Sequence, residues 1–222
     1  MLSKTVRKPV RFFAYWEAVM VNLQLDLPNF KKLAESIQGQ NADMQKAIDR
    51  TISDCKSRAP AQITKAVTAV YGIKSSEVSA AGRMAKLGAK TVGELKLAGA
   101  SVKSLQLVYK GRRLTPLHFS MTPRTKPKGK RYAVKAAIYK GQKKKLTGKA
   151  QYNTPVFLAP QKQGIILPFQ RMGESRMPVY AIHTTSIPQM IENDKVAADI
   201  KEKMDELFTT RLQHHIDRLQ KK

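Results

Sequence analysis

The sequence predicts an α+β protein, with N-terminal helices, a central antiparallel β body and a long C-terminal helix. Three observations predict this order. Apolar residues recur at helical spacing after Leu27, alternate with a period of two between Leu105 and Phe169, and return to helical spacing after Val196. We therefore expect a basic β-rich body flanked by helices.

Residues 1–20 differ in composition from the rest of the chain and are expected to form an N-terminal extension. The segment starts with four basic residues and continues with an aromatic cluster between Phe12 and Trp16. It is either an arm that docks on a neighbouring molecule or the product of a start codon upstream of Met20. A secretory signal peptide is disfavoured, because Glu17 interrupts the apolar run and no small-residue cleavage site comes after it.

Residues 21–222 are expected to form a single domain whose first part, residues 21–90, is helical. The first helical pattern carries one apolar stripe, which comprises Phe30, Leu33, Ile37, Met44, Ile48, Ile52 and Cys55. Gly39 is expected to bend or break this pattern. Pro60 is expected to open a second helix that stops at Gly72, because proline is tolerated in a first helical turn.

The β-rich part, residues 100–185, comes after a short third helix and a Gly- and Ala-rich connection, Leu87–Ala100. Alternating apolar residues predict strands at Val102–Tyr109, Leu114–Phe119, Arg131–Tyr139, Thr154–Ala159, Ile165–Gln170 and Pro178–His183. Lys110–Arg112 is expected to be a turn, and Thr122–Lys130 a loop with two prolines. Gly141–Gly148 is expected to be a basic hairpin tip or loop.

Residues 186–222 are expected to form the C-terminal helix, with Ser186 as the cap of a short preceding turn. The apolar stripe of the helix comprises Val196, Ile200, Met204, Leu207, Phe208, Leu212 and His215. Acidic residues interleave with two lysines on the rest of the surface, and these acids are Asp199, Glu202, Asp205 and Glu206. We therefore expect all four carboxylates to lie on a solvated helix face.

Positive charge is concentrated in one part of the chain. The 222 residues carry 41 Lys and Arg against 16 Asp and Glu, a formal net charge of +25. Between Leu95 and Gly173 there are eighteen Lys and Arg and no acidic residue. Such a surface attracts polyanions, so nucleic acid or an acidic protein is the expected partner. No apolar run reaches the length of a membrane span, and no membrane partner is expected.

The candidates for contact with DNA, or for lining a DNA channel, are basic residues in the two expected loops. They are Arg124, Lys126, Lys128, Lys130, Arg131, Lys143, Lys144, Lys145 and Lys149. From loops these side chains would reach phosphates without reading base sequence, and salt would weaken the contact. The alternative is that the loops pack against acidic subunits of an assembly or stay solvated. The nearby Tyr109, Tyr132 and Tyr139 are expected in the core or at an interface.

The sequence contains no pattern for catalysis, and we expect no catalytic residues, no metal site and no cofactor. The phosphate-binding GxxxxGK[ST] and GxGxxG motifs and the GxSxG motif are all missing. The four histidines are scattered, and the adjacent His214 and His215 diverge on a helix. Cys55 belongs to an apolar stripe and is expected to be a buried structural thiol. The protein is therefore not expected to be an enzyme.

The C-terminal third contains three spaced motifs, Phe169-Gln170-Arg171, Arg176-Met177-Pro178-Val179 and Thr184–Met190, followed by a charged helix. Near the N-terminus, Tyr71–Val78 forms a junction after a helix. From about Leu23 to the C-terminus, the chain resembles the prophage minor tail protein Z family of lambda-like phages. The residues that carry the family motif are structural, and they are Phe169, Arg171, Pro178, Ser186, Pro188 and Met190.

This resemblance implies a structural phage or prophage tail protein that acts in tail completion at the head–tail junction, around the DNA exit channel. It implies a ring of copies, contacts with neighbouring tail or neck proteins, and nonspecific contact with double-stranded DNA in transit. The expected location is the virion, and the host cytoplasm during assembly. The alternative, which rests on charge alone, is a nonspecific nucleic-acid-binding protein.

Overall fold

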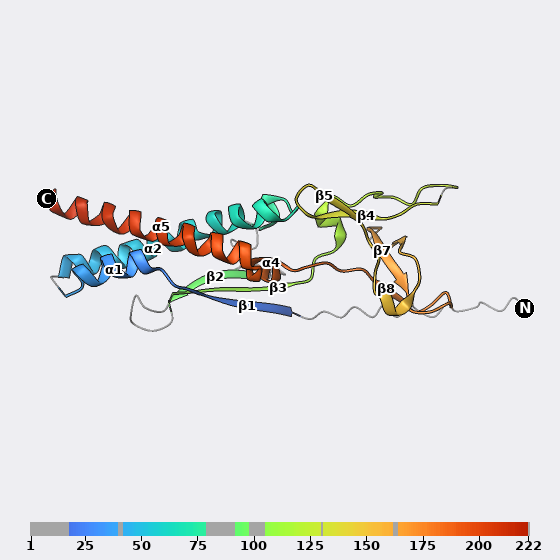
Figure 1. Cartoon of the computed structure of the whole chain (residues 1–222), viewed down its shortest axis with the longest axis horizontal. Helices are drawn as coiled ribbons and strands as arrows, with labels where there is room; N and C mark the ends of the chain where they lie inside the picture. The colour runs from blue at the N-terminus through green and yellow to red at the C-terminus, as the bar shows by residue number, and fades with distance from the viewer. Residues whose placement is uncertain are drawn as a thin grey trace, which may run out of the picture. The chain divides into compact units, whose positions relative to one another are not determined.

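The chain forms two compact units in the computed structural model, which describes residues 18–39, 42–78, 92–97, 105–129, 131–161 and 164–221. Within these residues, the helical unit comprises parts of Glu17–Leu114, Tyr139–Gly141 and Thr185–Lys222. The basic unit comprises Thr115–Ile138 and Gln142–Thr184. Helices and antiparallel strands confirm the α+β class (Figure 1).

The N-terminal part of the helical unit holds α1 (Pro28–Ile37) and α2 (Ala42–Val70). These helices confirm the expected break near Gly39, whose φ of +85° is a left-handed conformation that glycine adopts without steric cost. After α2, the described residues Ser75–Val78 are helical, where the third helix was expected. Its expected continuation lies outside the described residues.

The expectation that Pro60 opens a new helix is wrong, because Pro60 lies inside α2. Proline lacks the N–H that would bond the preceding turn, so a helix interior normally loses stability there. The buried residues Cys55, Ala59, Ile63 and Val67 nevertheless recur every four positions on both sides of Pro60. The stripe is therefore unbroken at Pro60, and α2 as a whole packs against α5.

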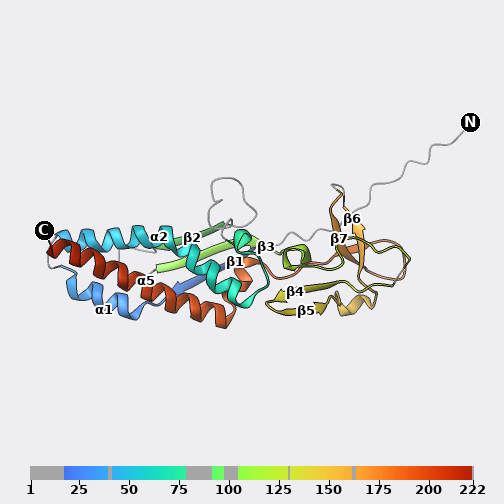
Figure 2. The ribbon, with the colours of Figure 1, turned by 90° about the horizontal axis from the view of Figure 1, so that it is seen from above.

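The long C-terminal helix is confirmed as α5 (Asp194–Gln220), which packs against both α1 and α2. Figures 1 and 2 show α5 running beside α2 in both views. Its buried side chains include Ile200, Met204, Phe208 and Leu212. Phe208 meets Phe30 of α1 edge to face, with ring centroids 4.9 Å apart. The core of the helical unit lies where these three helices meet.

A short helix, α4 (Ile187–Glu192), precedes α5, and the expected cap at Ser186 is confirmed. The Ser186 hydroxyl accepts a hydrogen bond from the Gln189 backbone N–H, and the Gln189 side chain accepts one from the Ser186 N–H at 3.0 Å. This capping box satisfies two backbone donors at the helix start. Pro188 and Met190 are buried in α4.

A three-stranded antiparallel sheet completes the helical unit, in the order β1 (Ala18–Leu25), β3 (Leu105–Arg112), β2 (Val92–Leu97). Alternate residues of β3 are buried, as expected for a sheet with one face covered. The contacts of α4 with β1 and β3, and of α5 with β1, show that helices cover that face (Figure 1).

The sheet corrects three expectations. Leu87–Ala100 is not only a connection, because it contains β2. Lys110–Arg112 is not a turn, because these residues pair with Ala18–Met20 of β1. The last residues of the expected N-terminal extension are therefore part of a strand, and residues 1–17 lie outside the described part of the chain. Pairing between distant segments, which local composition does not encode, produces all three differences.

The basic unit begins with a single-turn 3₁₀ helix, η1 (Pro116–Phe119), where a strand was expected. That expectation is wrong because Pro116 has no N–H to donate to a strand ladder. A two-stranded sheet comes next, with β4 (Lys135–Tyr139) and β5 (Gln142–Lys145). The turn between them holds Gly141 at φ +75°.

The second sheet of the basic unit confirms the last three expected strands. Its order is β6 (Phe157–Pro160), β7 (Ile166–Arg171), β8 (Val179–Ala181), and both pairs are antiparallel. Two small apolar clusters hold the unit together. One contains Met121, Val134 and Leu158, the other Leu167, Phe169 and Val179, and the half-buried Leu117 packs against both.

Candidate nucleic-acid interface

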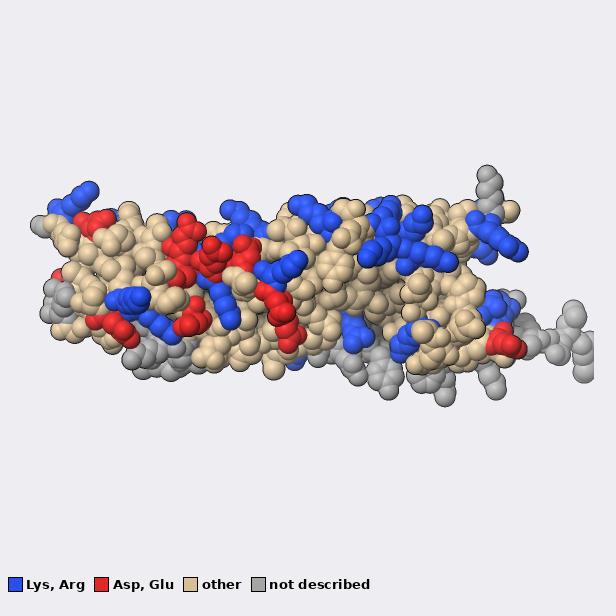
Figure 3. Space-filling view, in the orientation of Figure 1, with Lys and Arg blue, Asp and Glu red and all other residues tan. Residues whose placement is uncertain are grey.

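Eight of the nine predicted DNA-contact residues lie in the basic unit and are exposed, and the ninth, Lys130, lies outside the described residues. The eight are Arg124, Lys126, Lys128, Arg131, Lys143, Lys144, Lys145 and Lys149. In the part of the chain that the structure describes, no carboxylate forms an ion pair with any of them. Figure 3 shows Lys and Arg gathered over the region of β4 and β5, whereas Asp and Glu gather mainly over the helical unit. The fold therefore leaves these cations available to an external anion.

The local structure around these residues differs from the sequence prediction in one respect. Lys143, Lys144 and Lys145 lie in strand β5 and not at a hairpin tip, because the turn falls at Lys140-Gly141. All four residues of β5 are exposed. Successive side chains of a strand point to opposite faces, so Lys144 faces away from the other two lysines. Arg124, by contrast, lies in the loop between η1 and β4, as expected.

The backbone of Lys149 is held by hydrogen bonds to a buried glutamine, Gln170. Gln170 of β7 is 1% exposed. Its side-chain oxygen accepts a hydrogen bond from the Lys149 N–H at 2.7 Å, and its amide nitrogen donates to the Lys149 and Thr154 carbonyls, both at 3.0 Å. Gly148, at φ +70°, makes room for this amide, since a Cβ there would lie 2.4 Å from Gln170 Oε1.

The Lys149 side chain lies over aromatic rings. Its Nζ is 4.4 Å from the ring centroid of Tyr180 and 6.0 Å from that of Tyr152. The centroids of the Tyr152 and Tyr180 rings are 6.4 Å apart, and the two ring planes make an angle of 52°. An ammonium over an aromatic face is attracted by the ring quadrupole. Sequence reasoning selected Lys149 and quoted Gln170 only as part of a motif, and it missed Tyr152 and Tyr180. No spacing rule joins residues from β7, β8 and the short helix η2 (Ala150–Tyr152).

The three tyrosines considered from the sequence have other roles. Tyr109 is 2% exposed in β3, which confirms its place in the core. Tyr139 stacks on Tyr71 with ring centroids 5.2 Å apart. Tyr132 is half-buried, and its hydroxyl accepts a hydrogen bond from the Leu158 N–H at 3.0 Å. None of these three side chains adjoins Lys149 in the described contacts.

The six residues on which the resemblance was based are divided between the two units. Phe169 is buried in β7. Arg171, at the end of the same strand, is exposed, and its guanidinium carbon lies 5.6 Å from the ring centroid of Phe157. The Pro178 carbonyl accepts a hydrogen bond from the Met172 N–H. Ser186, Pro188 and Met190 belong to the start of α4 in the helical unit. Their contacts within the chain are structural.

A further expectation about the helical unit is wrong, and it concerns Asp205. This residue is 7% exposed and does not lie on a solvated face. Its carboxylate accepts hydrogen bonds from the Phe30 N–H at 3.0 Å, the Asn29 N–H at 3.3 Å and the Asn29 side chain at 2.7 Å. Asp205 of α5 thus caps the start of α1, which has no capping side chain of its own. A carboxylate also favours the positive end of the helix dipole.

The described residues do not assemble a metal-binding group. Among them, no three His, Cys, Asp or Glu side chains are close enough to hold a metal ion. Cys55 is buried as expected, and burial, aided by the nearby Asp54, raises the pKa of its thiol to about 12, so the nucleophilic thiolate is disfavoured. His215 is half-buried, and its Nε2 lies 3.2 Å from Asp54 Oδ2.

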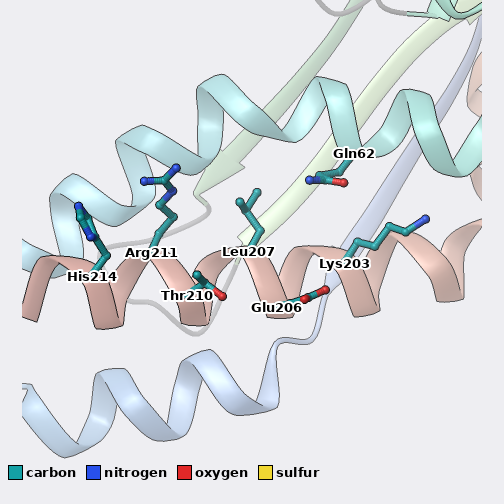
Figure 4. Close-up of a pocket in the computed structure, with 7 residues that line it drawn as sticks. All are labelled: Gln62, Lys203, Glu206, Leu207, Thr210, Arg211 and His214. Carbon is teal, nitrogen blue, oxygen red and sulfur yellow. The ribbon is translucent and has the colours of Figure 1, made fainter. Parts of the chain in front are cut away.

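A pocket lies between α2 and α5 in the helical unit (Figure 4). Gln62 comes from α2, and the other lining residues, among them Lys203, Glu206 and Arg211, come from α5. Lys203 is already paired with Asp199 at 2.6 Å. A lining that mixes both signs of charge offers no selectivity for an anion, so the exposed cations of the basic unit remain the stronger candidate interface.

Comparison with known proteins yields no relative: the chain matches no family model, no curated protein and no solved structure. No helix of the described residues combines the length and apolar character needed to cross a membrane.

Proposed function

We propose that this chain is a structural phage or prophage tail protein that acts in tail completion at the head–tail junction, where its basic unit contacts the DNA. One observation carries the proposal: thirteen Lys and Arg and a single carboxylate, Glu174, belong to the basic unit. The resemblance of the C-terminal motifs to the minor tail protein Z family supports the assignment to a tail.

The charge distribution suits contact with DNA that moves. Lys and Arg side chains bind phosphates without regard to base sequence, and each contact releases counterions, so binding weakens as salt rises. A protein beside a DNA path needs such weak, sequence-independent contacts, because base-specific ones would hold the DNA in place. No catalytic group is required for this role.

The proposal includes partners other than DNA. Copies of the chain would form a ring, and neighbouring tail or neck proteins would contact that ring. A closed ring requires each copy to present two different surfaces, one to each neighbour. The exposed backbone of an edge strand such as β1 or β5 is one kind of surface that pairs with another chain.

Electron microscopy and infectivity of particles that lack this protein test the proposal. We expect tails that fail to join heads, or joined particles that do not infect, and we expect the wild-type gene supplied in trans to restore both. Particles that assemble and infect normally without the protein would contradict a role in tail completion.

A second candidate function is a nonspecific nucleic-acid-binding protein, favoured by the same exposed cations. Native mass measurement separates the two candidates. A ring supports the tail protein. A monomer that binds DNA tightly at low salt and loses affinity steeply as salt rises supports the alternative.

A further inference from the structure

We infer that Lys149, held on Tyr180 and Tyr152, is a preorganised phosphate-binding site for duplex DNA, and that Gln170 positions it. The inference rests on the proposed DNA contact of the basic unit, and it identifies Lys149 as the residue that contributes most to that contact. The other candidate cations would then supply diffuse attraction around it.

The main chain at Lys149 is fixed from inside the basic unit. Gln170 bonds both the N–H and the C=O of Lys149 and reaches on to the Thr154 carbonyl, so one buried amide fastens both ends of the Lys149–Thr154 segment. These three backbone groups are thereby satisfied by a side chain that is 1% exposed. Gly148 permits this close approach.

The side chain is fixed as well, because Nζ lies 4.4 Å from the Tyr180 ring centroid and 6.0 Å from that of Tyr152. A lysine in solution retains many rotamers and loses their entropy when it binds a ligand. Contacts that are formed before the ligand arrives reduce that cost and raise affinity. Among the described residues, Lys143, Lys144 and Lys145 make no such contact with an aromatic ring.

The expected ligand group is a phosphate and not a nucleobase. The ammonium of Lys149 already lies over the face of Tyr180, so a base cannot stack there without displacing it. The 52° tilt between the two rings also rules out a parallel slot for a base. An ammonium is a point charge that binds phosphate oxygens, and it keeps its outer side toward solvent because Lys149 is exposed.

The test measures the affinity of the full chain for a duplex of about 30 base pairs by fluorescence anisotropy, between about 50 and about 200 mM salt. We expect Lys149→Ala to weaken binding about tenfold and the matched control Lys145→Ala about twofold, because both remove one charge but only one removes a preorganised contact. Thermal unfolding of each variant verifies that it is folded.

Variants that keep the charge of Lys149 but remove the groups that hold it measure how much its fixed position contributes to binding. Gln170→Leu removes the clamp, Gly148→Ala pushes the amide away, and Tyr180→Leu removes the ring under the ammonium. We expect each to weaken duplex binding about threefold while the dependence of affinity on salt stays unchanged, since the number of neutralised phosphates is the same. Because Gln170→Leu leaves buried groups unpaired, Tyr180→Leu decides the outcome if that variant does not fold.

Equal losses for Lys149→Ala and Lys145→Ala would overturn the positioned site and leave the DNA contact of the basic unit intact. A preference for single-stranded DNA that disappears in Tyr180→Leu would overturn it in favour of base stacking. If the wild-type chain binds no duplex even at low salt, the proposed DNA contact itself fails, and the inference fails with it.

Discussion

The helical unit and the basic unit use charge in opposite ways. In sequence, the helical unit carries 24 Lys and Arg against 15 Asp and Glu, and several pairs are in contact, such as Lys31 with Asp26 at 2.7 Å. The basic unit has only Glu174 against its thirteen cations. Its cations therefore have almost no internal counter-charge, whereas the helical unit carries 15 carboxylates and pairs some of them with its cations.

The cores of the two units differ as well. Three helices and a sheet bury large side chains in the helical unit, including Phe30 and Phe208, both 0% exposed. The basic unit relies on two small clusters around short strands. The comparison indicates a division of roles, in which the helical unit supplies stability and the basic unit presents charge.

The largest expected effect tests whether the helical unit supplies the stability of the protein. Asp205→Ala should lower the free energy of unfolding by about 2–3 kcal/mol, because the Phe30 N–H loses its partner in a buried place and α1 loses its cap. Urea unfolding followed by circular dichroism measures this. Asp199→Ala is the matched control on the same helix, and it should cost less than about 0.5 kcal/mol because its pair with Lys203 is partly exposed. Similar losses of unfolding free energy for Asp205→Ala and Asp199→Ala would contradict the role of Asp205 as the cap of α1.

The second prediction tests the basic unit. Replacement of Lys143, Lys144 and Lys145 by Gln should weaken duplex binding about tenfold at low salt and reduce the salt slope by about 2–3, as expected for three lost phosphate contacts. The unfolding free energy should stay nearly constant, because these side chains are exposed. Anisotropy titrations and urea unfolding measure the two quantities.

A matched triple variant in the helical unit sharpens this result. Lys31, Lys46 and Lys203 each contact a carboxylate, at 2.7, 3.0 and 2.6 Å. Their replacement by Gln removes the same amount of charge but should change duplex affinity by less than about twofold, since these cations are already paired. If both triple variants lose affinity equally, net charge governs binding and the difference between the units has no functional meaning.

The last prediction concerns alkaline pH. Burial raises the pKa of Tyr109 to about 12, and burial together with the nearby Tyr139 raises that of Tyr71 to about 12. The folded state therefore holds these two protons more tightly than the unfolded state, whose phenols ionise near 10. The resulting stability is complete below about pH 10 and is lost as pH rises toward about 12.

Ultraviolet titration of the folded protein should accordingly show two late-ionising tyrosines. Tyr109→Phe should remove one of them and leave the other. Ionisation of every tyrosine near pH 10, in a chain still folded by circular dichroism, would show that the core of the helical unit is not closed to solvent.

Much of the fold was predictable because it depends on local periodicity. The stripes that define α1, α2 and α5 and the alternation in β6, β7 and β8 are properties of consecutive residues. The predicted strand at Leu114–Phe119 and the predicted start of a helix at Pro60 were both wrong at a proline. At Pro116 the missing N–H, which apolar alternation does not reveal, excludes the strand, whereas Pro60 lies inside a helix whose buried stripe continues on both sides of it.

By itself, the sequence determined the fold class, the position of the long helices and the segregation of charge, because an acid-free stretch remains acid-free however it folds. Only the tertiary structure decided which charged residues form specific contacts with distant parts of the chain. Asp205 caps a helix start 175 residues away in the chain, and Gln170 fastens Lys149 across 21 residues. The physical reason is that hydrogen bonding and desolvation depend on distance in space, which spacing along the chain does not encode once the chain turns back on itself.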